Sequence, residues 1–411
     1  MANPPRRKPG PKPKPKLRSK DVRGAKYLRS VMHLLRPLHA HKDCTNRTLH
    51  FDEYVAYLLL YFFNPIVTSL RGLQQVSTLR KMRTLRLPRF SLGSFSEARN
   101  VFDPSLLEPL IAVLVAEATE AHADPRLTAL GVAATVADAT PIRALPKMLW
   151  ALWRDDEHRA AKVHLEYSLL RHVPTRATIT DHNTAESHVL NETLTAGKLY
   201  VLDRGYTDYA LMAEIIEAGS SFLLRLPNNA VYEILEERPL DAAARKRGIR
   251  HDRVVKLGCH TSPELHGRRV RLIEVHVTDP NALLGRPRKG RVDRKTKVYR
   301  TAKTEHTLLL VTDRLDLDAA LIADLYRCRW HIELFFRWLK AILRADRLIS
   351  LSRNGLTLVV YCALIASLLI TLWTGRKATK RTYEMICLYL VGWADDDEVE
   401  AHIAKLQPAV D

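Results

Sequence analysis

The stretch Leu199–Leu226, LYVLDRGYTDYALMAEIIEAGSSFLLRL, decides the fold class. Its first four residues are apolar, predict a short buried strand, and end directly before Asp203. A helix is predicted over Asp208–Ala218 and a second apolar strand over Phe222–Leu226. Strands that alternate with helices indicate an α/β fold.

Between Gly131 and Thr180, upstream of this stretch, the predicted strands follow one another without a helix. Gly131–Ala137 (GVAATVA) is the first of them and ends at Asp138. His164–Leu170 and Thr175–Thr180 come next, and Thr184–Leu194 is a predicted helix. An antiparallel run followed by alternation of strands and helices predicts a mixed sheet.

Downstream, the pattern predicts strands and loops and then one long helix. The expected strands are Val231–Leu235, Arg253–Leu257, Arg269–Val277, Lys297–Arg300 and His306–Val311. The helix runs from Asp318 to about Leu343.

Residues 22–123 are expected to be helical. Asp52–Phe63 is strongly apolar and stops at Asn64-Pro65. Ser94–Glu97 has the pattern of a capping box, and Asp103-Pro104 is expected to open the next helix.

Gly355–Thr374 carries no charge over 20 residues, a length that can span a bilayer. The segment is solitary and contains Tyr361, Ser367 and several threonines, so we expect a helix buried in a soluble domain. A membrane protein is the alternative, and solubility without detergent would argue against it.

The net charge of +19 on 411 residues is concentrated in three places. Residues 1–20 and 285–303 each carry +8, and Val76–Arg89 carries +5, so the rest of the chain is nearly neutral. Local basic patches favour a nucleic acid as partner. The five cysteines are scattered without a CxxC pair, which disfavours a disulfide framework or zinc ribbon and fits a reducing cytoplasm.

Asp138 and Asp203 directly follow apolar strands. Residues at strand ends are held rigidly beside a crevice, and carboxylates are ligands that Mg²⁺ prefers. With one further carboxylate, they could hold two ions for in-line phosphoryl displacement. A strand-end Asp is also a common helix cap, so the two aspartates alone leave both interpretations open.

The long predicted helix supplies a third carboxylate. Tyr326, Arg329, Glu333 and Lys340 are 3, 4 and 7 residues apart and therefore share one helical face. A Glu beside an Arg and a Lys suits a metal ligand flanked by phosphate-binding groups. The same pattern also suits a salt-bridged solvent face.

Tyr326-x2-Arg329-x3-Glu333-x6-Lys340 resembles the YREK signature of bacterial insertion-sequence transposases, the group of the fourth insertion sequence and the fifth transposon. Other segments resemble the first and second Asp motifs and the N-terminal region of this family. They are Val136–Thr140, Val201–Tyr206, and Ser96–Arg99 with Val101–Asp103. The likeness covers about residues 25–375.

This resemblance implies an RNase H-like mixed-sheet catalytic core with a β-strand insertion domain and an N-terminal helical DNA-binding domain. It implies a DDE triad, Asp138, Asp203 and Glu333, that holds two Mg²⁺ ions, for which Mn²⁺ can substitute. The chain would cleave double-stranded DNA at the terminal inverted repeats of its element and join the ends to target DNA.

The expected domains are a basic, disordered Pro/Lys-rich arm (1–20), a helical DNA-binding domain (21–125), the catalytic core (126–226 and 306–375), the insertion (227–305) and a helical tail (376–411). The residues expected to bind DNA are Tyr326, Arg329, Lys340, Arg204, Arg286, Arg288, Lys289, Arg80 and Lys81. Arg329 and Lys340 should lie on the DNA side of their helix and be dispensable for folding. The alternative for Arg329 is a structural salt bridge to Glu333 that only orients the acid.

The expected setting is the bacterial cytoplasm, in association with the nucleoid, as a homodimer on DNA and away from any membrane. A catalytically silent DNA-binding relative and a nuclease without strand transfer are the alternatives. Some relatives stack a Trp of the insertion on a flipped base, but Tyr232 and Tyr299 are the only aromatic residues between Pro227 and Thr304, which leaves a hairpin intermediate open. Lys162 and His164 are weaker candidates that face either the site or the core, and no HExxH motif supports zinc at His331.

Overall fold

The protein is described from a computed structural model. It describes residues 31–40, 48–67, 69–118, 130–143, 160–258, 267–277, 306–343 and 352–406, with the single residues 127, 148, 150, 151, 265 and 350. The expected arm 1–20, the expected strand Lys297–Arg300, and Arg286, Arg288 and Lys289 lie outside the described residues.

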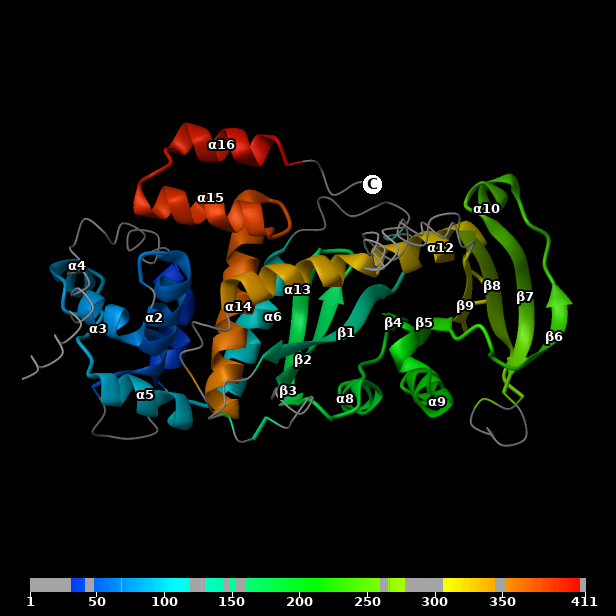
Figure 1. Cartoon of the computed structure of the whole chain (residues 1–411), viewed down its shortest axis with the longest axis horizontal. Helices are drawn as coiled ribbons and strands as arrows, with labels where there is room; N and C mark the ends of the chain where they lie inside the picture. Colours follow the sequence, from blue (N-terminus) through cyan, green and yellow to red (C-terminus); the bar gives the residue numbers. More distant parts are fainter. Residues whose placement is uncertain are drawn as a thin grey trace, which may run out of the picture. The chain divides into compact units, whose positions relative to one another are not determined.

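The chain forms two compact units, coloured along the sequence in Figure 1. The first unit contains the described residues up to Phe102 together with Ile386–Asp396. The second unit contains Asp103–Met385 and the described residues from Asp397 onward.

The helices of the first unit pack around an aromatic core. They are η2 (Arg36–Ala40), α2 (Phe51–Phe63), α3 (Leu70–Ser77), α4 (Arg80–Thr84) and α5 (Leu92–Val101). Almost every residue of α2 is buried, and its Tyr54 and Tyr57 rings lie 4.5 Å from Phe95 and 4.8 Å from Phe90, respectively. The apolar run that predicted this helix therefore reflects burial on all sides.

The expected capping box at Ser94–Glu97 is wrong. The helix α5 already begins at Leu92, because the Ser91 hydroxyl accepts a hydrogen bond from the Ser94 N–H and caps it there. Asp103 does act as a cap: its side chain accepts from the Ser105 N–H and opens the turn η3 (Pro104–Leu107), which leads into α6 (Glu108–Glu117).

A mixed sheet forms the framework of the second unit, as predicted, in the order β3-β2-β1-β4-β5-β9-β8-β7-β6 (Figure 1). Its strands are β1 (Ala133–Arg143), β2 (Ala160–Ser168), β3 (Val173–Asp181), β4 (Lys198–Leu202), β5 (Ser221–Leu226), β6 (Tyr232–Glu237), β7 (Ile249–Leu257), β8 (Val270–Val277) and β9 (His306–Thr312).

The directions of the strands place several carboxyl ends at one edge. β4 is parallel to both β1 and β5, while β2 is antiparallel to both β1 and β3. The strands β1, β3, β4 and β5 therefore all point the same way, and their carboxyl ends lie at a common edge of the sheet. β2 begins at that edge, where Ala160 pairs with Arg143.

The strands that follow β5 extend the same sheet. β9 pairs antiparallel with β5 on one side and with β8 on the other, so β8, β7 and β6 continue the sheet outward. The chain between β5 and β9, where the insertion was expected, thus leaves the core and returns to it through β9.

Helices cover the sheet of the second unit. Besides α6, they are α8 (Glu186–Glu192), η4 (Arg204–Tyr206), α9 (Tyr209–Glu217), α10 (Ala242–Lys246), α12 (Ala319–Cys328), α13 (Trp330–Leu343) and α14 (Arg353–Thr374). Two further helices, α15 (Lys380–Val391) and α16 (Asp396–Ala404), contribute residues to both units.

The long helix expected from Asp318 to Leu343 is divided in two. Asp318 caps α12 as expected, but the Arg329 N–H bonds to the Tyr326 carbonyl and the Ile332 N–H bonds to the Arg329 carbonyl. These three-residue turns interrupt the α-helical hydrogen bonding and separate α12 from α13. Arg329 therefore lies at a junction rather than within one continuous helix.

The apolar helix α14 is buried, as expected from its composition. It is long and apolar enough to cross a membrane, but 78% of its most apolar window is buried inside the protein. It packs against β3, α6 and α13, and the Tyr361 hydroxyl donates to the Glu108 carboxylate at 3.0 Å. The helix thus forms part of the core that supports the sheet.

The packing of α14 predicts a large cost for shortening Leu364, which has no exposed surface. Leu364→Ala should lower stability by about 2–5 kcal/mol, because it removes apolar contacts and leaves a cavity. Thr357→Ala on the same helix is the control, with an effect of about 0.5 kcal/mol or less. Thermal melting of the two variants tests this, and equal melting temperatures would contradict the buried packing.

Candidate active site

The shared edge of the sheet brings Asp138 and Asp203 together. Val136 is the last residue of β1 that pairs with β4, and its partner is Val201. Asp138 lies two residues beyond this pair, and Asp203 follows β4 directly. Asp138 was expected to end its strand, but β1 continues to Arg143 because β2 still supplies hydrogen bonds on the other side.

Asp203 is held by the turn that follows it. Its Oδ1 accepts the Gly205 N–H at 2.7 Å and caps η4. A Cβ at Gly205 would lie only 3.0 Å from this oxygen, so any larger residue would push the Asp203 carboxylate by a few tenths of an ångström. Tyr206, the next residue, is buried beside the acids. The capping interpretation of Asp203 is thus correct, and it leaves the aspartate at the edge with Asp138.

Arg329 joins two of the predicted acids. Its Nη1 donates to Asp138 Oδ2 at 3.2 Å, and its Nη2 donates to Glu333 Oε1 at 2.6 Å. The side chain is buried, with 6% of its surface exposed. The sequence predicts Arg329 on the DNA side of its helix and dispensable for folding. The structure instead buries it between β1 and α13, where its removal would leave two carboxylates without their counter-charge.

The other residues of the predicted helical face lie in different environments. Tyr326 is 2% exposed, and burial raises the pKa of its hydroxyl to about 12. Lys340 is exposed on α13, and Arg204 is exposed next to Asp203. The structure therefore brings Tyr326, Arg329 and Glu333 to the acids, and it places Lys340 on the surface of the helix.

The predicted basic residues of the first unit belong to a separate surface. Arg80, Arg83, Arg86 and Arg89 are exposed on α4 and the segment after it, and Lys81 is half-buried. Arg86 adopts the left-handed conformation, with φ of 59°, at the end of α4. Hydrogen bonds from Arg86 N–H to Arg83 O and from Leu87 N–H to Met82 O form the Schellman motif that turns the chain there.

Glu186 is a residue that the sequence did not single out. It is the first residue of α8, and its Oε1 lies 3.5 Å from Lys162 Nζ. Lys162, one of the weaker candidates, also donates to the Thr184 carbonyl at 3.0 Å. An acid in the first turn of a helix that follows a strand is a signal the sequence does contain. Locating it beside Asp203, however, requires the order of the strands.

The candidate histidines His164 and His331 have structural roles. His164 is buried on β2 with Nε2 2.8 Å from the Thr180 hydroxyl, and burial lowers its pKa to about 4. Burial likewise lowers the pKa of His331 to about 3, and its ring lies 5.0 Å from that of His172. Both imidazoles are therefore neutral near pH 7.

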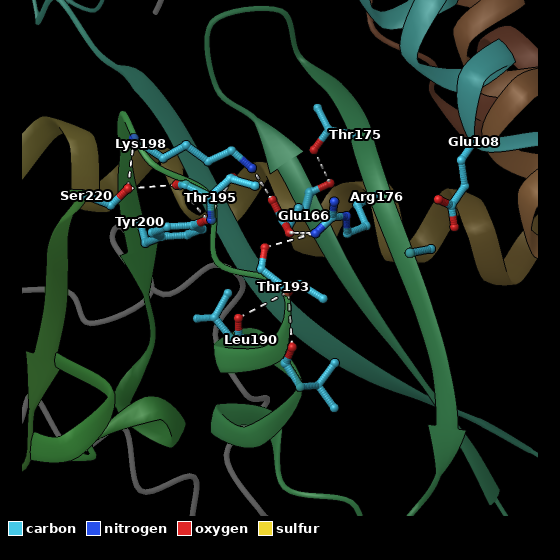
Figure 2. A network of polar contacts seen from close by, with 12 residues as sticks. Glu108, Glu166, Thr175, Arg176, Leu190, Thr193, Thr195, Lys198, Tyr200 and Ser220 are labelled. Atoms are coloured by element: carbon cyan, nitrogen blue, oxygen red, sulfur yellow. Dashed lines mark hydrogen bonds and ion pairs between the residues drawn. The ribbon is translucent and has the colours of Figure 1, made fainter. Parts of the chain in front are cut away.

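An ionic network around buried Glu166 braces the sheet near the site (Figure 2). Glu166 on β2 accepts a hydrogen bond from Lys198 Nζ at 2.6 Å, and its other oxygen lies 3.7 Å from Arg176 Nη1. Arg176 also donates to the Thr193 carbonyl at 2.9 Å, at the end of α8. The network thus links β2, β3 and β4 and fixes one end of α8.

Negative charge dominates the site. Burial raises the pKa of Asp138 to about 7 against the opposing charge of Arg329, and the charges of Asp203 and Glu186 contribute to this rise. Burial and the charge of Asp203 also raise the pKa of Glu186, against the effect of Lys162. The acids therefore repel one another in the absence of added cations.

The donor chemistry of the site fits a divalent cation. Carboxylate oxygens are the ligands that Mg²⁺ and Mn²⁺ prefer. Within the part of the chain that the structure describes, no three His, Cys, Asp or Glu side chains are arranged to hold an ion as they stand. The Arg329 guanidinium lies between Asp138 and Glu333 and supplies the positive charge that these two carboxylates share.

Comparisons with known proteins give a consistent family. Residues 133–369 match the family model described as a transposase DDE domain. The protein y4zB of Sinorhizobium fredii, named as a transposase, is 26% identical over 231 residues, 56% of this chain and 57% of that protein. The transposase named for insertion sequence element IS5377 of Geobacillus stearothermophilus is 22% identical over 298 residues, 72% of this chain and 70% of that one. The chain thus spans little more than half of the first relative.

Among solved structures, a piggyBac transposase synaptic complex with hairpin DNA, determined by cryo-EM, resembles the chain with a TM-score of 0.39. The sequence identity is 8%, and the alignment covers 95% of this chain and 83% of that one.

The burial of Asp138 predicts a pH-dependent stability in metal-free buffer. Between about pH 4 and about pH 7, the folded chain keeps a proton on Asp138 that the unfolded chain has released, since its pKa is raised from 3.8 to about 7. The free energy of unfolding should therefore fall as the pH rises through this window. Asp138→Asn cannot ionise and lacks this effect. The melting temperature of the variant relative to wild type should rise from pH 4 to pH 7, and a constant difference would contradict the burial.

Proposed function

The chain belongs to the transposase DDE-domain family, and from this premise we propose that it binds the terminal inverted repeats of an insertion sequence, cleaves the DNA ends and joins them to target DNA. One observation carries the proposal. Asp138 and Glu333 are remote in sequence but are joined by the buried guanidinium of Arg329, at the same edge of the sheet where Asp203 lies. We further propose that the chain belongs to the YREK-signature group.

We propose an RNase H-like catalytic core. The order β3-β2-β1-β4-β5, with β2 antiparallel to its neighbours and β1, β4 and β5 parallel, supports this assignment. The described strands β6–β8 then occupy the expected insertion between the second Asp and the Glu.

In the proposed reaction, Asp138, Asp203 and Glu333 would hold two Mg²⁺ ions, which when bound stabilise the attacking and leaving oxygens of the phosphodiester. Arg329 keeps the Asp138 and Glu333 carboxylates together. Its side chain must release at least one of them when the ions bind. Buried Tyr206 excludes water from the inner side of Asp138 and Asp203, since it lies beside both of them.

Double-stranded DNA is the proposed partner, bound by a homodimer in the cytoplasm. Exposed Arg204 and Lys340 lie on the elements that carry Asp203 and Glu333, and this supports the proposal that they contact phosphates next to the cleaved bond. The exposed arginines around α4 would bind phosphates farther along the duplex.

The triad predicts that Asp203→Asn and Glu333→Gln each abolish cleavage of end DNA while binding of that DNA persists. The substitutions keep the size of each side chain and remove the charge that holds the ions. Glu192→Gln is the control, because Glu192 is an exposed acid on α8. Gel-based cleavage and binding assays on the same preparations test this. Normal cleavage by Glu333→Gln would show that the triad is assigned wrongly.

The basic surface of the first unit predicts that removing its arginines weakens DNA binding and makes that binding less dependent on salt. The double variant Arg80→Ala/Arg83→Ala should reduce the slope of log K against log salt by about 2, because two phosphate contacts are lost. The control is Lys246→Ala/Lys405→Ala, which removes two exposed charges of the second unit, one at the end of α10 and one directly after α16. An unchanged slope in the Arg80/Arg83 variant would exclude this surface from the DNA interface.

A further inference from the structure

Glu186 lies at the same edge of the sheet as the proposed triad. β3 is parallel to β1 and ends at Asp181, which is therefore at the edge where Asp138 lies. Asp181 Oδ1 accepts the N–H groups of Asn183 and Thr184 and turns the chain, so that α8 starts at Glu186. The position of this acid thus follows from the strand order and one turn.

The carboxylate of Glu186 is close to that of Asp203. Both approach the position that a Cβ on Gly205 would occupy: Asp203 Oδ1 lies 3.0 Å from that point and Glu186 Oε2 lies 3.9 Å from it. Because residue 205 is glycine, no side chain separates the two carboxylates there. Two like charges in such proximity favour a cation nearby.

The helix that carries Glu186 is held at both ends. Lys162 Nζ bonds to the Thr184 carbonyl and pairs with Glu186 Oε1 at the start of α8. Arg176 Nη1 bonds to the Thr193 carbonyl at its end (Figure 2). The Glu186 side chain is 28% exposed, so it retains access to solvent ions. The ion pair with Lys162 explains where Glu186 Oε1 lies. It does not explain why Glu186 Oε2 lies near Gly205, beside Asp203.

The charge balance of the site favours an additional ligand role. Asp138, Asp203, Glu186 and Glu333 can carry four negative charges, and their ion pairs supply Arg329 and Lys162 as cations. Each pair of acids thus faces one cation, so both sides keep excess negative charge. Arg329 pairs with both Asp138 and Glu333, whereas Lys162 pairs with Glu186 Oε1 and no ion pair reaches Asp203 within the described residues, which makes the Asp203–Glu186 side the more accessible place for a divalent ion.

We infer that Glu186 is a fourth carboxylate of the active site and that it acts with Asp203 to hold a divalent cation, with Lys162 fixing its orientation. This inference rests on the function proposed above. Glu186 would contact the ion either directly, as a ligand, or through a water bound to the ion.

The test is Mn²⁺ binding to the full chain without DNA, measured by isothermal titration calorimetry. Glu186→Gln should weaken the binding of one ion by roughly 10–100-fold, and the Mg²⁺ concentration needed for half-maximal DNA cleavage should rise in parallel. Glu192→Gln, at the other end of the same helix, should bind Mn²⁺ like wild type. Asp203→Asn serves as the reference for loss of the site.

The outcomes separate this inference from the proposed function. If Asp203→Asn loses Mn²⁺ binding while Glu186→Gln binds it as wild type does, Glu186 has no role in the metal site and the proposed function stands. If neither variant changes Mn²⁺ binding, the metal site itself is wrong. Should Glu186→Gln fail to fold, Glu186→Ala replaces it, and wild-type Mn²⁺ affinity in that variant would overturn the inference.

Discussion

The Arg329 guanidinium holds Asp138 and Glu333 together, and the arrangement of the acids at the sheet edge depends on this contact. Arg329 and Asp138 are 191 residues apart in the chain, so the ion pair ties the junction of α12 and α13 to β1. Burying a charge is costly unless it is paired, and here each partner supplies the counter-charge that the other needs. The pair is nevertheless unequal, since one guanidinium faces several acids. The result is a site with excess negative charge, which is the condition for attracting divalent cations.

The directions of the strands explain why these acids meet at all. Parallel pairing of β1 with β4 places Asp138 and Asp203 at one edge, and the antiparallel β2 returns the chain so that β3 ends there as well. Glu186 and Lys162 reach the edge by this route. On the other side, β9 pairs with both β5 and β8, so the excursion through β6–β8 returns the chain to the core just before α12. The third acid therefore comes from the first helices after that return.

The sequence was most informative where local chemistry alone determines the structure. The strand before Asp203, the helix that Asp208 caps and the apolar helix α14 are all as predicted, because burial and capping act over a few residues. The mixed sheet is confirmed too, and the meeting of Asp138 with Glu333 agrees with the motifs. The DNA contacts of the basic residues and the division into domains stay predictions.

Features that depend on distant partners could not be predicted. The length of β1 beyond Asp138 depends on β2, and the break at Arg329 depends on the acids that this residue bonds. Helical spacing correctly placed Arg329 next to Glu333 but not its burial. Glu186 escaped notice because its significance comes from Asp203, which lies on a different element. Ser94–Glu97 had the letters of a capping box, yet Ser91 caps the helix earlier.

The most direct test of the proposed site is to locate Mn²⁺ by its anomalous scattering in crystals of the full chain bound to end DNA. We expect density beside Asp203 and between Asp138 and Glu333, with the Arg329 guanidinium displaced from at least one of its two carboxylates. A structure at saturating Mn²⁺ that shows no such density, with Arg329 still bonded to both Asp138 and Glu333, would contradict the assignment of these acids as a metal site.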